Sequence, residues 1–356
     1  MIKLLHAADL HLDSPFSHLP PEQGARRRQE QREYLALLPG LCQKEQCDVV
    51  LLAGDLFDTR QVYRETWQAL QSALEACQVP VFLAPGNHDA IGPDSPYCKG
   101  SWPDNVHIFT STEIETVDLG AFTVSGAAFC GSELPSLAGY TAPADGRTHL
   151  MVLHGEVSNT ESPYRTATPA QVAASKLSYL ALGHIHQRGA RRTATGTTYA
   201  WPGCMMGRGF DETGSKGVYL VEVAESSVQV RFLHCSAPRY EILDVPVTEL
   251  DQLCARLPAD SRRHHYRIRL TGIVPAPDLA PLQRKLAPLT ASVQLEDLTQ
   301  APLRQVTAQE DTLAGLFVQQ IQAAMETAAD DAQRETLTLA MELGLQALEG
   351  REVTLP

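Results

Sequence analysis

Gly86-Asn87-His88-Asp89 is the stretch of sequence that decides the fold. It follows Val79-Pro-Val-Phe-Leu-Ala84, an apolar run with β-branched and aromatic residues, which predicts a buried strand. Pro85 and Gly86 then break the strand and turn the backbone sharply. The turn places an amide, an imidazole and a carboxylate at a strand end, where open α/β sheets carry their chemistry. Such a tetrapeptide is usually only a turn, so its meaning depends on how the other strands end.

Two earlier strands end in the same kind of motif. The apolar run Ile2–Ala8 leads into Asp9-Leu-His11, and Asp48–Ala53 leads into Gly54-Asp55-Leu-Phe-Asp58. Two predicted helices separate the three strands, about Gln23–Lys44 and about Glu65–Ala76. The order β-α-β-α-β predicts a sheet whose strand ends share one edge.

Two later strands also end in histidines. His149-Leu-Met-Val-Leu153 runs into His154-Gly155, and Leu177–Leu182 runs into Gly183-His184-Ile-His186. Strand patterns continue as far as about Phe232, and we expect the first domain to end near residue 240. The chain therefore predicts an α/β domain over residues 1–240 in which five strands end in polar side chains.

The rest of the chain predicts two smaller parts. Residues 241–300 alternate strand and helix patterns and predict a small α+β domain, whereas residues 305–350 predict a pair of amphipathic helices. These helices either dock on their own domain or offer a groove to a partner helix. The densest basic stretch of the chain consists of Arg262, Arg263, Arg267 and Arg269. Its arginines are either solvated charge on an edge strand or a rim that faces nucleic acid, and the sequence leaves both open.

The composition is that of a folded protein without membrane spans. The 356 residues are 44% hydrophobic and 20% charged, and the apolar runs are only as long as strands. The start of the chain lacks the pattern of a secretory leader. The eight cysteines contain no Cys-x-x-Cys pair, so we expect reduced, mostly buried thiols and not a zinc cluster or a disulfide framework. We therefore expect a cytoplasmic protein with no membrane contact.

The net charge of −13 counts against tight, non-specific binding to nucleic acid. Much of this surplus lies in the last part of the chain, because residues 308–356 contain nine acidic and two basic side chains. Divalent cations bound elsewhere would reduce the negative charge further. The acidic balance therefore does not exclude an enzyme that cleaves nucleic acid.

Together the strand ends predict a metal centre. Any single motif has an ordinary explanation, since a Gly-Asp turn often caps a helix and a buried histidine often bonds to the backbone. Five such motifs are harder to explain in that way, because carboxylates and imidazoles at one sheet edge are costly without positive charge between them. A pair of divalent ions would supply this charge. The candidate side chains are Asp9, His11, Asp55, Asp58, Asn87, His88, Asp89, His154, His184 and His186.

The mixture of ligand types favours manganese, iron or zinc over calcium. Carboxylate, amide and imidazole groups suit these ions, whereas the lack of thiolates argues against structural zinc. Two ions about 3.5–4 Å apart can share a carboxylate and a bridging hydroxide, which attacks a phosphate held by both ions. The sequence therefore predicts hydrolysis of a phosphoester.

The order Asp-x-His, Gly-Asp-x-x-Asp, Gly-Asn-His-Asp, His, Gly-His-x-His over residues 9–186 resembles the calcineurin-like metallophosphoesterases, and among them the SbcD-type DNA-repair nucleases. The fold that this resemblance implies is a two-sheet β-sandwich flanked by helices. It also implies one metal ion on Asp9, His11, Asp55 and His186, and a second on Asp55, Asn87, His154 and His184.

In the same family pattern, His88 would be the catalytic histidine, which protonates the leaving oxygen or stabilises the transition state. Asp58 would orient His88 and favour its protonated form, because a neighbouring carboxylate raises the pKa of an imidazole. These roles are implied by the resemblance, and the spacing alone does not assign them.

The likeness to SbcD-type nucleases depends on Asp9-Leu-His-Leu-Asp13-Ser-Pro-Phe, on the small α+β domain and on the terminal helices. In those nucleases the α+β domain is a cap that guides DNA, and the helices bind the coiled-coil base of an SbcC-like ATPase. The segment Trp201–Gly214 departs from the Pro-Gly-Ser pattern usual in SbcD and is more similar to YhaO-type exonuclease-like proteins. Arg208 in this segment either touches a substrate phosphate or forms a structural salt bridge.

The resemblance implies a metal-dependent DNA exonuclease, with manganese as the expected ion, that works from a 3′ end as the DNA-repair nuclease subunit of an ATPase–nuclease complex. The resemblance also implies a homodimer. A phosphodiesterase or phosphatase for small molecules or phosphoproteins is the first alternative, and the acidic net charge favours it. The second alternative is a non-catalytic scaffold of an ATPase complex, against which the intact set of candidate ligands counts.

Overall fold

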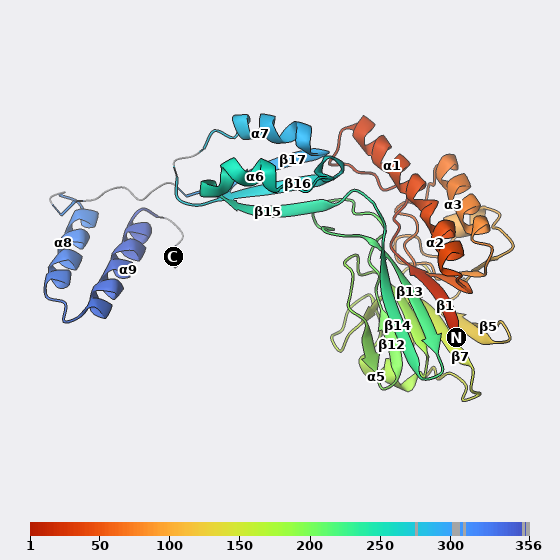
Figure 1. Ribbon diagram of the computed structural model, residues 1–356. Coiled ribbons are helices and arrows are strands. Elements are labelled where there is room, and N and C mark those ends of the chain that lie inside the picture. The colour runs from red at the N-terminus through yellow and green to blue at the C-terminus, as the bar shows by residue number, and fades with distance from the viewer. Residues whose placement is uncertain (275–276, 301–306, 309–310, 351–352, 354–356) are drawn as a thin grey trace. The chain divides into compact units, whose positions relative to one another are not determined.

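The computed structural model describes residues 1–356 except for 275–276, 301–306, 309–310, 351–352 and 354–356 (Figure 1). The chain divides into two compact units. The first unit holds residues 1–242, 258–267 and 287–293, and the remaining segments belong to the second. Within the described residues, no helix combines the length and the apolar character that a membrane span requires.

Six strands of the first unit form one sheet, in the spatial order β14-β13-β1-β2-β3-β4. Strands β1 to β4 are parallel; β13 pairs antiparallel with β1, and β14 pairs antiparallel with β13 at the edge of the sheet. The parallel arrangement brings the carboxyl ends of β1, β2 and β3 to one edge of the sheet. The bounds are β1 Ile2–Ala7, β2 Val49–Leu52, β3 Val81–Leu83, β4 Val106–Ile108, β13 Gly217–Ala224 and β14 Ser227–His234.

A second six-stranded sheet has the order β11-β12-β10-β7-β6-β5. Its four inner strands are parallel, and the two edge strands β11 and β5 are antiparallel to their neighbours. The bounds are β5 Glu115–Asp118, β6 Phe122–Gly126, β7 Thr148–His154, β10 Tyr179–Gly183, β11 Arg192–Ala194 and β12 Thr197–Ala200. After β7, the short strands β8 (Glu156–Val157) and β9 (Arg165–Ala167) form a separate ladder.

The two sheets share one apolar core. Leu4 and Leu51 of the first sheet belong to the same buried cluster as Leu150 and Val152 of the second. Alternate residues of the first sheet point to its other face, where they pack against helices α1 (Pro21–Leu35), α2 (Leu37–Glu45) and α3 (Arg64–Ala76). Helix α5 (Pro169–Ala174) contributes to the cluster on the outer face of the second sheet. The predicted sandwich flanked by helices is therefore confirmed.

His6 of β1 connects the two sheets inside this core. Its ring is fully buried, with Nδ1 2.9 Å from the hydroxyl oxygen of Tyr179 and Nε2 3.1 Å from the carbonyl oxygen of Leu182. Burial lowers the pKa of His6 to about 3, although the carbonyl of Leu182 partly opposes the shift. The neutral ring thus joins β1 to β10, and both of these strands lead to candidate ligands.

The single helix predicted for residues 23–44 is wrong, because the structure contains two helices. Helix α1 ends at Leu35 and α2 begins at Leu37. Pro39 has no N–H to donate to the carbonyl of Leu35, and its ring crowds that carbonyl, so one continuous helix is disfavoured. The N–H of Ala36 donates instead to the carbonyl of Glu33, at 3.3 Å, in a tighter turn.

The segment that follows β14 alternates strands and helices as predicted. Its strands form a sheet with the order β15-β16-β17, in which Tyr266, Ile268 and Leu270 are buried. The bounds are β15 Tyr240–Pro246, α6 Leu250–Arg256, β16 His265–Thr271, α7 Ala280–Leu286 and β17 Ser292–Asp297.

The two arginines of the basic stretch that lie in residues 265–271, Arg267 and Arg269, have partners within the protein. Arg269 forms two hydrogen bonds of 2.6 and 2.7 Å with the carboxylate of Asp244. The guanidinium of Arg267 lies 4.4 Å from the centre of the Phe210 ring. These contacts favour a structural role for both arginines over a rim that is free to meet nucleic acid.

Helices α8 (Leu313–Glu326) and α9 (Asp331–Leu348) pack closely against each other. A Cβ built on Gly344 of α9 would lie 2.1 Å from Cζ of Phe317 in α8. Leu313 of α8 takes no part in this packing, since its side chain is 71% exposed. The packed face of α8 runs through Val318, and Leu313 lies about 140° around the helix from that residue.

Candidate metal centre

The candidate site lies where strands of both sheets end. Strands β1, β2 and β3 of the first sheet are followed by Asp9, Asp55 and Asn87. In the second sheet, β7 ends at His154 and β10 ends directly before His184. The structure brings all seven predicted ligands together with His88 and Asp58.

Four of these residues adopt a left-handed backbone conformation that non-glycine residues rarely take: Asp9 (φ 53°), His11 (45°), Asp55 (50°) and His184 (92°). Strain of this kind persists only where the surroundings hold it, and it concentrates at functional sites. Here the loops hold one another, because the N–H of Asp9 donates to the carbonyl of Gly54 and that of His11 donates to the carbonyl of Asp55. The N–H of His184 donates to Oδ1 of Asp9 at 2.8 Å, which joins the second sheet to the first.

Two glycines permit the close approach of these loops. A Cβ built on Gly86 would lie 2.2 Å from Oδ1 of Asp55, and one built on Gly183 would lie 1.8 Å from the carbonyl oxygen of Ala53. Any side chain at either position would push apart loops that carry candidate ligands.

Asp89 fixes the turn and is not a ligand in this geometry. Its carboxylate is buried and accepts hydrogen bonds from the backbone N–H groups of Leu56, Phe57 and Gly86, at 2.7, 3.1 and 2.8 Å. It therefore ties the turn at Gly86 to the loop that begins with Asp55.

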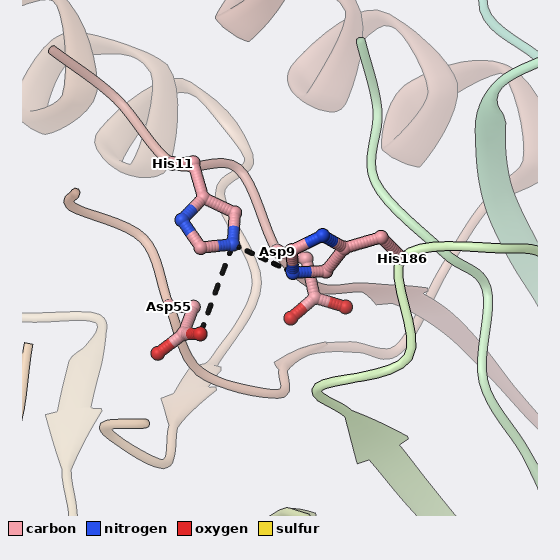
Figure 2. Close-up of side chains that lie close together, drawn as sticks. All are labelled: Asp9, His11, Asp55 and His186. Atoms are coloured by element: carbon pink, nitrogen blue, oxygen red, sulfur yellow. Dashed lines mark hydrogen bonds and ion pairs between the residues drawn. The ribbon is translucent and has the colours of Figure 1, made fainter. Parts of the chain in front are cut away.

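The first ligand group consists of Asp9, His11, Asp55 and His186, whose ligand atoms all lie within 4.8 Å of one another (Figure 2). Nε2 of His11 is 3.0 Å from Nε2 of His186 and 3.7 Å from Oδ2 of Asp55. Oδ2 of Asp9 is buried and has no hydrogen-bond partner among the described residues. Electron-donating atoms thus face one another around a common point.

The second ligand group consists of Asp55, Asn87, His154 and His184. Oδ1 of Asn87 is 3.0 Å from Nε2 of His154 and 3.2 Å from Nδ1 of His184. Oδ2 of Asp55 is 3.3 Å from Nε2 of His154, and the same oxygen faces His11 of the first group. Asp55 is therefore placed to serve both groups.

His88 and Asp58 lie beside the first ligand group. Oδ1 of Asp58 is 3.0 Å from Nδ1 of His88 and 3.1 Å from Nδ1 of His11. The hydrogen bond to Asp58 raises the pKa of His88, although partial burial opposes the shift. Burial also opposes ionisation of Asp58, but hydrogen bonds to His11 and His88 hold its pKa well below the usual range. One carboxylate therefore orients both a candidate ligand and the candidate catalytic histidine.

The electrostatics of the cluster favour a bound cation. Burial, with a smaller contribution from Asp55, raises the pKa of Asp9 to about 6. Burial lowers the pKa of His11 to about 4, since the ring has little access to water. Burial also disfavours charge on His154, but Asp55 and Asp9 outweigh it and raise the pKa of His154 to about 9. The carboxylates thus draw positive charge into a buried site.

These observations fit a pair of divalent ions. The unpartnered oxygen of Asp9, the facing nitrogens of His11 and His186, and the raised pKa of His154 all indicate a place for positive charge. The donors are carboxylate, amide and imidazole, as a transition-metal site would use, and no thiolate is among them. The two ligand groups, joined by Asp55, could each hold one ion.

The sequence did not identify Glu212 and Glu156, which contact candidate ligands. Oε1 of Glu212 is 2.8 Å from Nδ1 of His186, and Oε1 of Glu156 is 3.4 Å from Nε2 of His184. Glu156 lies two residues after His154 at the end of β7, so its position was visible in the sequence although its contact was not. Glu212 lies in a loop far along the chain from His186, and no local pattern could have revealed it. Arg208, predicted as either a phosphate contact or a salt bridge, pairs with Glu212 at 2.6 Å, and its contact with substrate stays a prediction.

Comparison with protein families gives a match over residues 2–188 to the family described as calcineurin-like phosphoesterase. Among individual proteins, the chain is 33% identical over 272 residues to the uncharacterized metallophosphoesterase YhaO of Bacillus subtilis. That match covers 71% of this chain and 65% of the YhaO protein, so the chain spans less than two thirds of that relative.

The chain is also 21% identical over 309 residues to the SbcD component of the nuclease SbcCD from Staphylococcus epidermidis. This second match covers 76% of this chain and 79% of the relative. Among solved structures, a dimetal phosphatase from Danio rerio aligns with a TM-score of 0.44 at 13% identity, over 65% of this chain and 95% of that one.

Proposed function

Because the chain belongs to the calcineurin-like phosphoesterase family, we propose that it is a metal-dependent exonuclease that hydrolyses phosphodiester bonds in DNA. The likeness to a component of a nuclease carries this proposal. The family match ends at residue 188, whereas the likeness to the S. epidermidis protein extends over 309 residues. The similarity therefore continues beyond the part of the chain that defines the family.

The two ligand groups would hold two divalent ions, and manganese is the ion we propose. When bound, such ions supply a nucleophile at neutral pH and positive charge for the phosphate oxygens. Asp55 would keep the two ions together, because it belongs to both groups.

His88 would assist departure of the leaving oxygen. Its Nδ1 is held by Asp58, so the proton available to a substrate is the one on Nε2. Because the pKa of His88 is raised, a larger fraction of its rings is protonated near neutral pH. The low pKa of Asp58 keeps the Asp58 carboxylate ionised. The side chain of His88 is 44% exposed, which leaves it open to a substrate.

The remaining parts of the proposal concern the rest of the chain. Residues 241–300 would cap the site and guide DNA, and the helix pair in residues 305–350 would bind an SbcC-like ATPase. The predicted helix-pair segment includes residues 305–306 and 309–310, which lie outside the described residues. We also propose attack from a 3′ end, a role in DNA repair, and a homodimer.

The test is a nuclease assay on the purified full-length chain with 3′- and 5′-labelled duplex and single-stranded DNA. Manganese, magnesium, iron and zinc are compared, and Asp55→Asn is the inactive control. We expect manganese-dependent loss of nucleotides from the 3′ end. Intact DNA in every metal, with and without an ATPase partner, would contradict the proposal.

A phosphodiesterase or phosphatase for small molecules or phosphoproteins is the second candidate. The net charge of −13 favours it, because an acidic surface repels a polyanion such as DNA. Rapid hydrolysis of a cyclic nucleotide or a phosphopeptide by a preparation that leaves DNA intact would decide for this function.

A further inference from the structure

The 204–216 loop, defined as residues 204–216, surrounds His186 with buried polar side chains that belong to neither ligand group. Glu212 is 2% exposed, and Lys216 and Cys204 are similarly buried. The loop is anchored at Gly207, whose carbonyl accepts a hydrogen bond of 2.8 Å from the buried Arg27 of α1. Burial of a charged group costs free energy because the group loses its hydration, so buried charges are usually paired or serve a specific function.

Glu212 is placed to set the proton position on His186. Its Oε1 lies 2.8 Å from Nδ1 of His186, and Nε2 of the same ring faces His11. A carboxylate that accepts the Nδ1 proton leaves the lone pair on Nε2, the nitrogen turned toward the first ligand group. The other oxygen, Oε2, accepts a hydrogen bond of 2.7 Å from the backbone N–H of Arg208, which fixes the carboxylate plane.

The guanidinium of Arg208 connects Glu212 with Asp58. Nη2 donates to Oε1 of Glu212 at 2.6 Å, and Nη1 donates to Oδ2 of Asp58 at 3.4 Å. Nη2 also lies 3.2 Å from Nδ1 of His186. That nitrogen cannot accept from Arg208 while it donates to Glu212, and the shorter distance assigns its proton to Glu212. Arg208 therefore touches both carboxylates that support the histidines of the first group.

The backbone of His186 is held by the same loop. The ammonium of Lys216 donates to the carbonyl of His186 at 3.3 Å, and the thiol of Cys204 lies 3.6 Å from the same oxygen. Lys216 and Cys204 thus contact the backbone of His186, whereas Glu212 and Arg208 contact its ring.

We propose that Glu212 and Arg208 are positioning residues for the first metal ion. Glu212 orients His186 and increases the basicity of its Nε2, and Arg208 holds Glu212 and Asp58 so that His186 and His11 face the same point. The proposal rests on the proposed metal-dependent function, but not on DNA as the substrate.

The test measures Mn²⁺ binding to the full-length chain without any substrate. For Glu212→Gln, which keeps the size of the side chain and removes its charge, we expect affinity for one of the two ions to fall about 10–100-fold. Glu75→Gln on the exposed face of α3 is the matched control and should bind as the wild-type chain does. Unchanged affinity for both ions in a folded Glu212→Gln protein would overturn the proposal.

A double variant, Arg208→Met with Glu212→Leu, separates positioning from simple charge pairing. Replacement of a buried ion pair by apolar side chains is often neutral for stability, so we expect a metal-free melting temperature close to that of the wild-type chain. Mn²⁺ affinity should nevertheless remain as weak as in Glu212→Gln. If the double variant bound Mn²⁺ as tightly as the wild-type chain, Arg208 and Glu212 would only neutralise each other's buried charge and would not position the ligands.

Failure of the wild-type chain to cleave DNA would count against the exonuclease proposal alone. Because the binding experiment uses Mn²⁺ and no nucleic acid, its outcome decides the positioning proposal independently.

Discussion

The two ligand groups differ in what supports their histidines. In the first group, His11 is held by Asp58 at 3.1 Å and His186 by Glu212 at 2.8 Å. In the second, Nδ1 of His154 donates to the backbone carbonyl of Ala53 at 2.8 Å. The carboxylate next to His184 is more distant, because Oε1 of Glu156 lies 3.4 Å from Nε2 of His184, and the Glu156 side chain is 29% exposed.

This difference indicates how each group will respond to substitution. A carboxylate that accepts a hydrogen bond from an imidazole increases the basicity of that imidazole, but a single substitution can remove the carboxylate. A backbone carbonyl cannot be removed in that way. The first group should therefore depend on residues outside its ligands, whereas the second should depend almost entirely on the ligands themselves.

The largest effect is expected for Asp55→Asn, because Asp55 is the residue that the two ligand groups share. Asp55 faces histidines of both groups, so loss of its charge should release both ions and abolish measurable hydrolysis. Metal analysis of the purified variant, together with its activity, tests this expectation. Retention of two tightly bound ions would show that Asp55 is not shared.

His88→Ala should separate metal binding from turnover. His88 contacts Asp58 and belongs to neither group, so both ions should remain bound. Loss of a general acid lowers kcat by about 10²–10⁴-fold. Steady-state kinetics and metal content, measured on the same preparation, give the two values. A variant that loses metal would reassign His88 as a ligand.

Glu156→Gln tests the second group in the way that Glu212→Gln tests the first. Its longer, partly solvated contact with His184 should contribute less, so we expect Mn²⁺ affinity to change by less than about tenfold. Binding isotherms of the two variants under identical conditions allow a direct comparison. Equal losses in both would remove the proposed difference between the groups.

His6 affects stability and not metal binding, so it provides a reference outside both groups. Its pKa of about 3 in the folded chain is below the ordinary histidine value of 6.5, so folding favours the neutral ring. The stability that this gives is complete above pH 6.5 and is lost as the pH falls toward 3. Between pH 6.5 and 5 the loss should be about 2 kcal/mol.

Urea unfolding of the metal-free protein at both pH values, for the wild-type chain and for His6→Gln, measures this contribution. The variant should show a smaller fall in unfolding free energy on acidification. An identical fall in both proteins would mean that His6 is not the buried group that titrates.

Much of the architecture could be predicted because the relevant signals are local. Apolar runs of strand length followed by Asp9, Asp55, Asn87, His154 and His184 are visible in the sequence, and each needs only its own neighbours to form. The break between α1 and α2 could also have been found, since Pro39 lies in the sequence. The exposure of Leu313 could not, because it depends on how α8 packs against α9.

The sequence by itself determined which residue types end the five strands and in what order, because the periodicity of apolar residues is a property of neighbours along the chain. Only the tertiary structure decided that the edges of two separate sheets meet and that the N–H of His184 reaches Asp9. Only the tertiary structure also placed Glu212 and Arg208 next to Nδ1 of His186. The physical reason is that a buried charge is stable only where partners from distant segments surround it. The separation of two residues along the sequence does not give the distance between them in the folded chain.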